Sequence, residues 1–579
     1  MSVILGAIHF DGHAADANHM AAVASAYASL GFGGHRIWTQ GPVGLMRWNR
    51  DGTSQSQHEI LPRSIQDDHL AITAEARLDN RDELFEALSI PRSDQETMSD
   101  STLILLAYQK WGEGCPEHLE GDFSFVLYDR QREALVCVQS VFPIQPLYYL
   151  QTGSCFAFGS MIRPLLSLAR VPKKLNEEFF ARYAGIAFMQ PDADPAKRFE
   201  TAFAGVSALP PATILVVERD GSTRRRTWWQ PDPNREIRLA SDQDYYDQVR
   251  EVTIRAVHDR LRTDQRVVCL LSGGLDSSAI ACIAARKLRE RGERLTAISS
   301  VLPLDHPGPE KDEREFIDIV KHAEDLDVKY LHPGPSKIDD AETHLDWLES
   351  PGSSPKDYVY REFYEAAKAC GAGVIMDGCG GEVGPTNHGF NLLPSLARQG
   401  QWSVVWHELN AMSRRTGRNP FGLFLREVIA PQFPGLKSLF RRLKNPLGPG
   451  EKVTLPLNRD FAREHGLSLQ VRGGSPFQDR FSDPKQQTAV AVRLMQGGTR
   501  NQPGMAHGIP TLYPFFDRRI IDCCLAVPAR LYQVDGWSRN LIRQSMHGIL
   551  PPQIQWRSCK RPFSPDFYRR FQAELPAVR

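Results

Sequence analysis

The sequence predicts two folding units, an α+β domain followed by an α/β domain built on a doubly wound parallel sheet. The chain has 579 residues, more than one hydrophobic core usually organises. Up to about residue 205 it alternates short apolar segments with turn residues, whereas from about residue 240 it repeats strand, loop and long helix. These patterns place the first domain at 1–207, a connecting segment at 208–240 and the second domain at 241–579.

The first domain is predicted from a series of short strands with few helices between them. One helix is expected at 101–112, where STLILLAYQKWG has helical spacing. This mixture indicates an α+β sandwich of packed sheets. The expected strands are VGLMRW (43–48), HLAITAEARL (69–78), DFSFVLYD (122–129), ALVCVQS (134–140), PLYYL (146–150) and CFAFGS (155–160).

The connecting segment contains LPPATILVVERDGSTRRRTWWQPD, residues 209–232. A proline turn opens it, and Asp220 and Gly221 lie at the tip of a predicted hairpin whose second strand is rich in arginine. We therefore expect 208–240 to form an interdomain hairpin and linker.

The second domain is predicted from repeated strand and helix pairs. Repetition of this unit implies a parallel sheet with helices on both faces. Residues 384 to about 455 are expected to be helical and irregular. Their basic run LKSLFRRLKNP (436–446) is typical either of a solvated helix face or of a peptide-docking surface. The repeating elements are strand VVCLL (267–271), helix SAIACIAARKLRERG (278–292), strand LTAISSVLP (295–303), helix VYREFYEAAKACG (359–371) and strand GVIMDG (373–378).

Composition argues against several classes of partner. The 69 basic residues balance 69 acidic ones, so net charge indicates no nucleic-acid or membrane partner. No apolar run approaches membrane-spanning length, and the N-terminal segment lacks the pattern of a secretory signal. The ten cysteines form no C-x-x-C pair, and Cys523 and Cys524 lie in an apolar helical pattern. We expect a reduced, cytoplasmic protein without structural zinc.

A phosphate-binding loop is predicted where LLSGGLDSS follows a buried strand. Backbone N–H groups of a tight turn, together with the positive end of the next helix, form an anion site. Glycines allow close approach, serines donate hydrogen bonds, and an aspartate here implies a bridging Mg²⁺. Because the loop has no lysine, it favours cleavage of ATP between the α and β phosphates. The predicted ATP-binding residues are Leu270, Ser272, Gly273, Gly274, Asp276, Ser277 and Ser278, with Asp276 also a Mg²⁺ ligand.

These motifs resemble those of the asparagine synthetase family, whose PP-loop ATP pyrophosphatase domain adenylates a carboxylate that an amine then attacks. The resemblance covers nearly the whole chain. LEGDFSFVLYD, IQPLYY and FAFGSMIRPLL are similar to the family's glutaminase-type (Ntn) domain, and LPPATILV with TWW to its interdomain segment. GVIMDGCGGEVG, YPFFDRRIIDCCLAVP, DGWSRNLIRQSMHGILPPQIQWR and SCKRPFSPDF resemble the synthetase domain in order.

The glutaminase-type domain departs from the family at three places. Glutamine-dependent members attack the amide with an N-terminal cysteine, whereas this chain has Ser2 and no cysteine before Cys115. The family's Asn-Gly-Glu aligns with residues 75–77, Glu-Ala-Arg, and its Arg-Asp reads Gln139-Ser140. We expect that this domain no longer makes ammonia, although serine can in principle serve as an N-terminal nucleophile.

In the synthetase domain the resemblance implies roles for three further motifs. Asp377 and Gly378 are expected to contact the ribose or base. Glu382, followed by Val383 where the family usually has Asp-Glu, is the second expected Mg²⁺ ligand. Lys560 matches the lysine that approaches the α-phosphate and the oxyanion of the tetrahedral intermediate, and it is the predicted catalytic residue.

Other positions in these motifs have two interpretations. Cys379, where asparagine synthetases commonly have a glutamate linked to amine handling, is either a small packed residue or a reactive thiol. Asp312 and Glu313 resemble an Asp-Glu pair near the nucleotide, but they can equally begin the helix EFIDIVKHA. Arg539 is expected to be structural.

The favoured hypothesis is an ATP- and Mg²⁺-dependent ligase of the lasso peptide cyclase type. The resemblance implies that an Asp or Glu side chain of a precursor peptide is adenylated and that the peptide's N-terminal amine closes a macrolactam. Expected partners are the core peptide, a leader peptidase and a leader-recognition protein. The alternatives are an asparagine synthetase, a small-molecule β-lactam synthetase and a non-catalytic scaffold that binds nucleotide.

Overall fold

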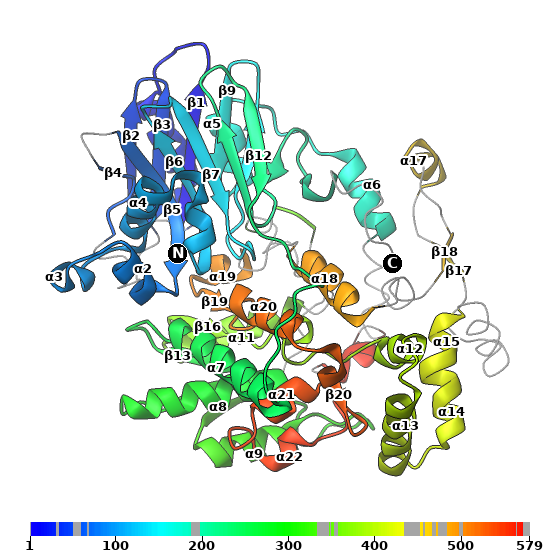
Figure 1. Cartoon of the computed structure of the whole chain (residues 1–579). Helices are drawn as coiled ribbons and strands as arrows, with labels where there is room; N and C mark the ends of the chain where they lie inside the picture. The colour runs from blue at the N-terminus through cyan, green and yellow to red at the C-terminus, as the bar shows by residue number, and fades with distance from the viewer. Residues whose placement is uncertain are drawn as a thin grey trace.

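The computed structural model contains two domains, with the N-terminal domain above the C-terminal domain in Figure 1. In that view the C-terminal domain continues to the right into a group of helices, α12 to α15. The structure describes residues 2–30, 34–49, 59–65, 69–186, 197–332, 347, 349–351, 357–433, 452–454, 458–465, 470–472, 483–496, 502–562, 564–570 and 572.

The N-terminal domain is a sandwich of two six-stranded sheets, as the sequence predicts. The strand orders are β10-β8-β9-β1-β3-β2 and β12-β11-β7-β6-β5-β4, and the paired strands within each sheet are antiparallel. The strands are β1 (Ser2–His9), β2 (His35–Gln40), β3 (Val43–Asn49), β4 (Arg63–Ile65), β5 (Leu70–Leu78), β6 (Gly121–Asp129), β7 (Ala134–Gln139), β8 (Tyr148–Gln151), β9 (Cys155–Gly159), β10 (Ser207–Ala208), β11 (Thr213–Val217) and β12 (Thr223–Thr227).

Strand β1 shows why this domain has several layers. Its side chains alternate between faces, so Val3 and Leu5 pack against helices while Ile4 and Ile8 pack against the second sheet. Helices α1 and α5 cover the outer face of the first sheet, and α4 covers that of the second. The helices are α1 (Ala17–Ala26), α2 (Arg81–Ala87), α3 (Arg92–Gln95), α4 (Asp100–Trp111), α5 (Ile162–Leu168) and α6 (Glu177–Ile186).

The predicted hairpin is present as β11 and β12, but it does not stand between the domains. Strand β11 pairs with β7 along 214–217, so the hairpin extends the second sheet of the N-terminal domain. The arginine-rich strand β12 is exposed along its length because it forms the edge of that sheet. Only the segment after β12 runs across to α7 (Asp242–Arg260).

The C-terminal domain is built on a five-stranded parallel sheet with the order β15-β14-β13-β16-β19. Helices cover both faces, as expected for a doubly wound sheet. Val267 and Cys269 face the core formed with α7 and α8, whereas Val268 faces α11. The elements are β13 (Val267–Leu270), α8 (Leu275–Glu290), β14 (Thr296–Ser300), α9 (Arg314–Glu324), β15 (Asp327–Leu331), α11 (Asp357–Ala369), β16 (Val374–Met376), β19 (Thr511–Leu512), α20 (Arg518–Ala526), α21 (Asn540–Ser545) and α22 (Pro552–Gln555).

The region after residue 384 is helical and irregular, as predicted. The basic run at 436–446 lies outside the described residues. The elements inserted between β16 and β19, together with two short strands that follow β19, are α12 (Leu392–Arg398), α13 (Trp402–Thr416), α14 (Pro420–Phe424), α15 (Ala430–Gln432), β17 (Lys452–Thr454), α17 (Arg459–Glu464), β18 (Gln470–Arg472), α18 (Pro484–Met495), α19 (Gln502–His507), β20 (Gln533–Val534) and β21 (Trp537–Ser538).

Two simpler expectations can be compared with the structure. Cys523 and Cys524 are buried in α20, as predicted. Within the described part of the chain, no helix is both long and apolar enough to span a membrane.

One hydrophobic core crosses the boundary between the domains. It joins Val141, Phe142 and Trp228 of the first domain to residues of α18, α20 and the loop after β19 in the second. The rings of Phe142 and Phe516 have their centroids 4.8 Å apart. The domains therefore share apolar surface that neither can cover alone.

A buried ion network lies beside this core. Arg260, at the end of α7, is 1% exposed, and its Nη1 atom lies 3.2 Å from Asp79 of the first domain and 3.0 Å from Asp517 of the second. Burial alone would raise the pKa of Asp517, but hydrogen bonds and charge from Arg519 and Arg260 hold that pKa below its usual value. Asp517 is therefore charged. Arg260 is shared by both carboxylates, and each has a further arginine partner, Arg77 for Asp79 and Arg519 for Asp517.

Replacing Arg260→Leu is expected to lower the free energy of unfolding by about 3–5 kcal/mol, because two buried carboxylates lose the cation that they share. Arg255→Leu is the matched control: Arg255 also lies on α7 and pairs with Glu83 across the domain boundary, but both side chains are nearly half exposed. That change should cost about 0–1 kcal/mol. Guanidinium unfolding measures both values, and equal losses would contradict the role given to the buried network.

Candidate active site

The predicted phosphate loop connects β13 to α8 at the carboxyl edge of the parallel sheet. Leu270 ends the strand and Gly274 is the N-cap of the helix. Gly273 has φ +69°, and a Cβ added there would lie 2.8 Å from Cβ of Phe316, so both conformation and space require glycine. The loop thus directs backbone N–H groups and the positive helix end to one point.

The serines of the loop have different environments. The Ser277 hydroxyl accepts a hydrogen bond from the Ser272 backbone N–H at 3.1 Å and lies 3.0 Å from the Ser272 hydroxyl. Ser277 therefore fixes the shape of the loop. The Ser278 hydroxyl is fully buried and has no hydrogen-bond partner among the described residues.

The second motif, after β16, rests directly on the first. A Cβ at Gly378 would lie 2.8 Å from the backbone nitrogen of Ser277, and one at Gly381 would collide with Oδ1 of Asp276. Thr386 Oγ1 donates to the same Asp276 oxygen at 2.6 Å. The two motifs therefore meet at the start of α8. The predicted Gly378 lies against Ser277, whereas Gly381 and Thr386, which were not predicted as site residues, lie against the Asp276 carboxylate.

Asp377 and Cys379 support the turn of the second motif. Asp377 Oδ1 accepts from the backbone N–H of Cys379 at 3.0 Å, and the Cys379 side chain packs against the interdomain core. The structure therefore supports the interpretation of Cys379 as a small packed residue.

Asp276 and Glu382 supply the carboxylate oxygens that Mg²⁺ prefers. Gly381, which precedes Glu382, lies against the Asp276 carboxylate, so the two predicted ligands come from touching segments. Glu382 is exposed in the 3₁₀ turn Gly381–Val383, whereas Val383 is buried in the interdomain core. These two carboxylates are donors of the kind that binds Mg²⁺. Val383 is apolar and buried, so Glu382 is the residue of this turn that can offer a carboxylate to the ion.

Lys560 lies beside the predicted phosphate loop. A Cβ added at Gly274 would be 3.5 Å from Lys560 Cε and 3.7 Å from its Nζ atom, which is ordinary van der Waals contact. The loop carries no lysine of its own, so the cation next to it comes from the C-terminal segment.

Arg557 holds Lys560 in place. Its guanidinium donates to the backbone carbonyl of Gly273 at 2.5 Å and to that of Cys559 at 2.7 Å, and its Nη2 atom lies 2.5 Å from Glu313 Oε2. Glu313 Oε1 accepts from the backbone N–H of Arg561 at 2.6 Å. These bonds tie both sides of Lys560 to the phosphate loop and to α9.

The capping interpretation of Asp312 and Glu313 does not describe Glu313. It occupies the N-cap position of α9 but makes no side-chain capping bond, and its carboxylate binds the C-terminal segment instead. Asp312 accepts from the backbone N–H of Leu302 at 2.8 Å and of Arg314 at 3.0 Å, so it organises the start of the helix.

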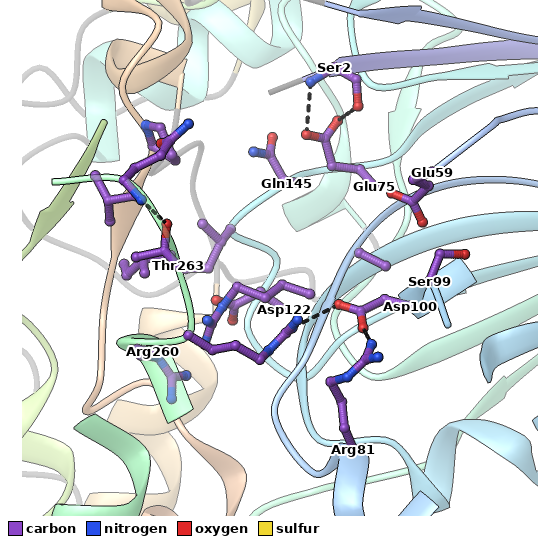
Figure 2. Close-up of a pocket in the computed structure, with 18 of the residues that line it drawn as sticks. Ser2, Glu59, Glu75, Arg81, Ser99, Asp100, Asp122, Gln145, Arg260 and Thr263 are labelled. Atoms are coloured by element: carbon purple, nitrogen blue, oxygen red, sulfur yellow. Dashed lines mark hydrogen bonds and ion pairs between the residues drawn. The ribbon is translucent and has the colours of Figure 1, made fainter. Parts of the chain in front are cut away.

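A pocket of about 290 Å³ lies between the two domains and is lined by residues of both, among them Ser2 and Glu75 of the first and Arg262 and Thr511 of the second. Figure 2 shows Ser2 with its nitrogen and its hydroxyl both directed at Glu75. The distances are 3.1 Å from Ser2 N to Oε1 and 3.2 Å from Oγ to Oε2. Burial raises the pKa of Glu75, and the bonds from Ser2 act in the opposite direction. The hydroxyl of Ser2 is thus held by a carboxylate.

The other residues at the altered positions of the N-terminal domain also have structural partners. Arg77 pairs with Asp79 and donates to the backbone carbonyl of Asp259 at 3.2 Å, across the domain boundary. Gln139 accepts from the backbone N–H of Leu147 at 3.0 Å, and Ser140 donates to the Phe142 carbonyl at 2.9 Å.

Comparison with known proteins agrees with this architecture. The asparagine synthase family model matches residues 248–578, more than half of the chain, and the model for a glutamine amidotransferase domain matches residues 1–229. The chain belongs to the asparagine synthetase family. This confirms the family resemblance predicted from the sequence motifs.

Curated relatives within the asparagine synthetase family are distant. The glutamine-hydrolyzing asparagine synthetase 3 of Bacillus subtilis is 30% identical over 39% of this chain and 35% of its own length. Asparagine synthetase 1 of the same organism is 23% identical over 85% of this chain and 75% of its own length. An amidase from Gibberella zeae is 27% identical over 35% of this chain and 29% of its own length. Two of these three matches thus span about a third of the relative.

Two residues of this asparagine synthetase family site were missed by sequence reasoning. Thr386 follows the second motif closely along the chain. Its hydroxyl, which can donate to a carboxylate, is the feature of the sequence that could have identified it. Arg557 lies within the quoted motif ILPPQIQWR, but a family motif does not say which of its residues turns inward. Both act on residues that were predicted, Asp276 and Lys560.

Arg557→Met should displace Lys560 and lower the rate of ATP-dependent pyrophosphate release by about a hundredfold, since small misplacements of a catalytic group have effects of this size. It should also destabilise the fold by leaving Glu313 buried without its cation. The double variant Glu313→Gln/Arg557→Met should recover stability but not activity. Arg569→Met, which removes an exposed pair with Glu310, is the control. Recovery of activity in the double variant would contradict the positioning role.

Proposed function

We propose that the protein is an ATP-dependent carbon–nitrogen ligase that forms AMP and pyrophosphate and takes its amine from a source other than glutamine. The observation that carries the proposal is the ammonium of Lys560 beside Gly274 of the phosphate loop. Membership of the asparagine synthetase family supports the same reaction class.

In the proposed first step, a carboxylate oxygen of the substrate attacks the α-phosphorus of ATP, and the bond to the bridging oxygen of pyrophosphate breaks. Mg²⁺ held by Asp276 and Glu382 would neutralise charge on the phosphates. The backbone N–H groups of the loop and the α8 N-terminus bind the pyrophosphate. Asp377 and Gly378, beside the start of α8, are proposed to contact the ribose or base.

In the second step, an amine nitrogen attacks the acyl carbon, loses one proton, and AMP leaves. Negative charge develops on the acyl oxygen in this step. A fixed ammonium about 4 Å from that oxygen is worth roughly 4 kcal/mol at an effective dielectric near 20. Lys560 is placed to provide this interaction and to face the α-phosphate in the first step.

The geometry of the pocket that holds Ser2 supports an amine source other than glutamine. An amide-hydrolysing site of this type needs an N-terminal nucleophile free to attack. Here Ser2 is 2% exposed and both of its donors are bound to Glu75. A serine hydroxyl is a weaker nucleophile than the cysteine thiolate of glutamine-dependent members, and Arg77, in the segment aligned with the family's Asn-Gly-Glu, is committed to the domain interface.

The finer proposal is that the amine and the carboxylate belong to one peptide, which the enzyme closes into a macrolactam as a lasso peptide cyclase does. Two features support it: the bound state of Ser2, and the helical region between β16 and β19 that widens the C-terminal domain beside the synthetase site (Figure 1). A leader peptidase and a leader-recognition protein are the partners this proposal requires.

Asparagine synthesis is the main alternative, because several of the curated relatives are named asparagine synthetases. Cys379 argues against it, since its side chain is packed in the interdomain core and offers no carboxylate near the adenylate. A β-lactam synthetase acting on a small molecule is a further alternative. A scaffold without catalysis is disfavoured by the approach of Lys560 to Gly274.

The function is tested by incubating the protein with Mg-ATP and measuring pyrophosphate release with three substrates: aspartate with ammonia, aspartate with glutamine, and a leader-free core peptide encoded beside this gene. We expect release only with the peptide, which should lose the mass of one water. Release with aspartate and ammonia would establish asparagine synthesis instead. Glutamate formed from glutamine at a comparable rate would contradict the assignment of Ser2 as inactive.

Lys560→Ala should lower pyrophosphate release by about a hundredfold to a thousandfold, as loss of one oxyanion donor typically does. ATP binding, measured by calorimetry, should persist because the backbone of the loop is intact. Lys560→Arg keeps the charge but not the compact ammonium, so it should recover only part of the rate. Full turnover by Lys560→Ala would remove Lys560 from the mechanism.

A further inference from the structure

A histidine and an arginine form an unusual pair near the phosphate loop. The Nε and Nη2 atoms of Arg539 lie 3.0 Å and 2.6 Å from the single Nε2 atom of His388. Because the guanidinium only donates, the Nε2 atom must accept, and the ring is therefore a neutral imidazole with its proton on Nδ1. The His388 ring also stacks on Phe390, with centroids 4.8 Å apart, which fixes its orientation.

The pair joins the loop that contacts Asp276 to the segment that begins α21. His388 comes two residues after Thr386, whose hydroxyl donates to Asp276. Arg539 directly precedes α21, and that helix is joined to the same loop by the bond from Ile542 N–H to the Pro385 carbonyl, 2.9 Å long. The pair is therefore anchored beside the proposed Mg²⁺ ligand.

The electrostatic environment links the pair to Lys560. Burial, followed by the positive charges of Arg539, Lys560 and Arg543, lowers the pKa of His388 to about 4. A protonated ring here would face three cations. His388 therefore stays neutral at ordinary pH and serves as the acceptor that orients Arg539.

Arg539 has a free edge in this arrangement. Within the described part of the chain its Nη1 atom has no hydrogen-bond acceptor, while the Nε and Nη2 edge is bound to His388. Its backbone has φ +57°, a conformation uncommon for arginine that persists where the surroundings require it. A guanidinium edge held in this way matches the geometry of phosphate oxygens.

We propose that His388 is a positioning residue that holds Arg539 so that its free guanidinium edge binds the pyrophosphate portion of ATP. The inference rests on the proposed function, because it requires ATP at this loop. It differs from the role of Lys560, which faces the α-phosphate. His388 acts only through Arg539, so its removal should affect ligands with β and γ phosphates and spare AMP.

Calorimetry on the full chain tests this with three probes in the presence of Mg²⁺: α,β-methylene-ATP, pyrophosphate and AMP. His388→Leu and Arg539→Met should weaken binding of the first two about tenfold or more, as expected for lost hydrogen bonds to a charged group. AMP binding should be unchanged. His388→Gln retains an acceptor and should stay within about threefold of the wild type. His407→Leu, which removes an exposed histidine paired with Asp535, is the control.

The outcomes separate the inference from the proposed function. If His388→Leu binds pyrophosphate as tightly as the wild type, or loses AMP as well, the positioning role is wrong while the ligase proposal stands. If His388→Gln is as weak as His388→Leu, the acceptor is not what matters and the inference also fails. If the wild type binds none of the three probes, the proposed function falls together with the inference.

Discussion

The direct contact between the two loops at the carboxyl edge of the parallel sheet is the constraint on which the rest of the site depends. Gly378 and Gly381 let the second motif approach the start of α8 until its backbone touches Ser277 and the carboxylate of Asp276. A side chain at either position would push the loops apart. Thr386 follows the second motif along the chain and donates to Asp276, so the contact between the loops also orients this carboxylate. His388 lies two residues further along the same loop.

The C-terminal segment contributes two cations to the site, Arg557 and Lys560, which differ in burial and in pairing. Arg557 is buried and compensated by Glu313, so its charge serves the fold by joining Gly273 to the segment that carries Lys560. Lys560 remains exposed beside the loop. Arg557 is therefore a cation neutralised by its buried partner, whereas Lys560 is an exposed cation beside the loop. This division gives the loop a positive neighbour without leaving a buried charge unpaired.

Local pattern was enough to predict the two-domain architecture and the strand-to-helix turn at 270–278, and the family resemblance singled out Lys560, which lies beside that turn. The loop at 270–278 is encoded by neighbouring residues, and its glycines and hydroxyls have few other uses in a strand-to-helix turn. The partners of Glu313 and His388 could not be predicted in this way, because each pairs with an arginine far along the chain. Choosing among the many arginines requires the packing of α9 and α21. The hairpin at 213–227 was recognised, but its pairing with β7 depends on sheet order, which alternation of side chains does not specify.

The core shared by the two domains has a consequence for synthesis of the chain. Val141, Phe142 and Trp228 leave the ribosome early, yet the residues of α18 and α20 that cover them are encoded roughly 260 to 380 positions later. At roughly 5–20 residues per second this apolar surface stays open for about 13–76 s. A nascent chain in this condition is open to aggregation, and binding by a chaperone during that interval would protect it. Whatever its own chemistry, the N-terminal domain cannot be removed without uncovering the matching apolar surface of the C-terminal domain.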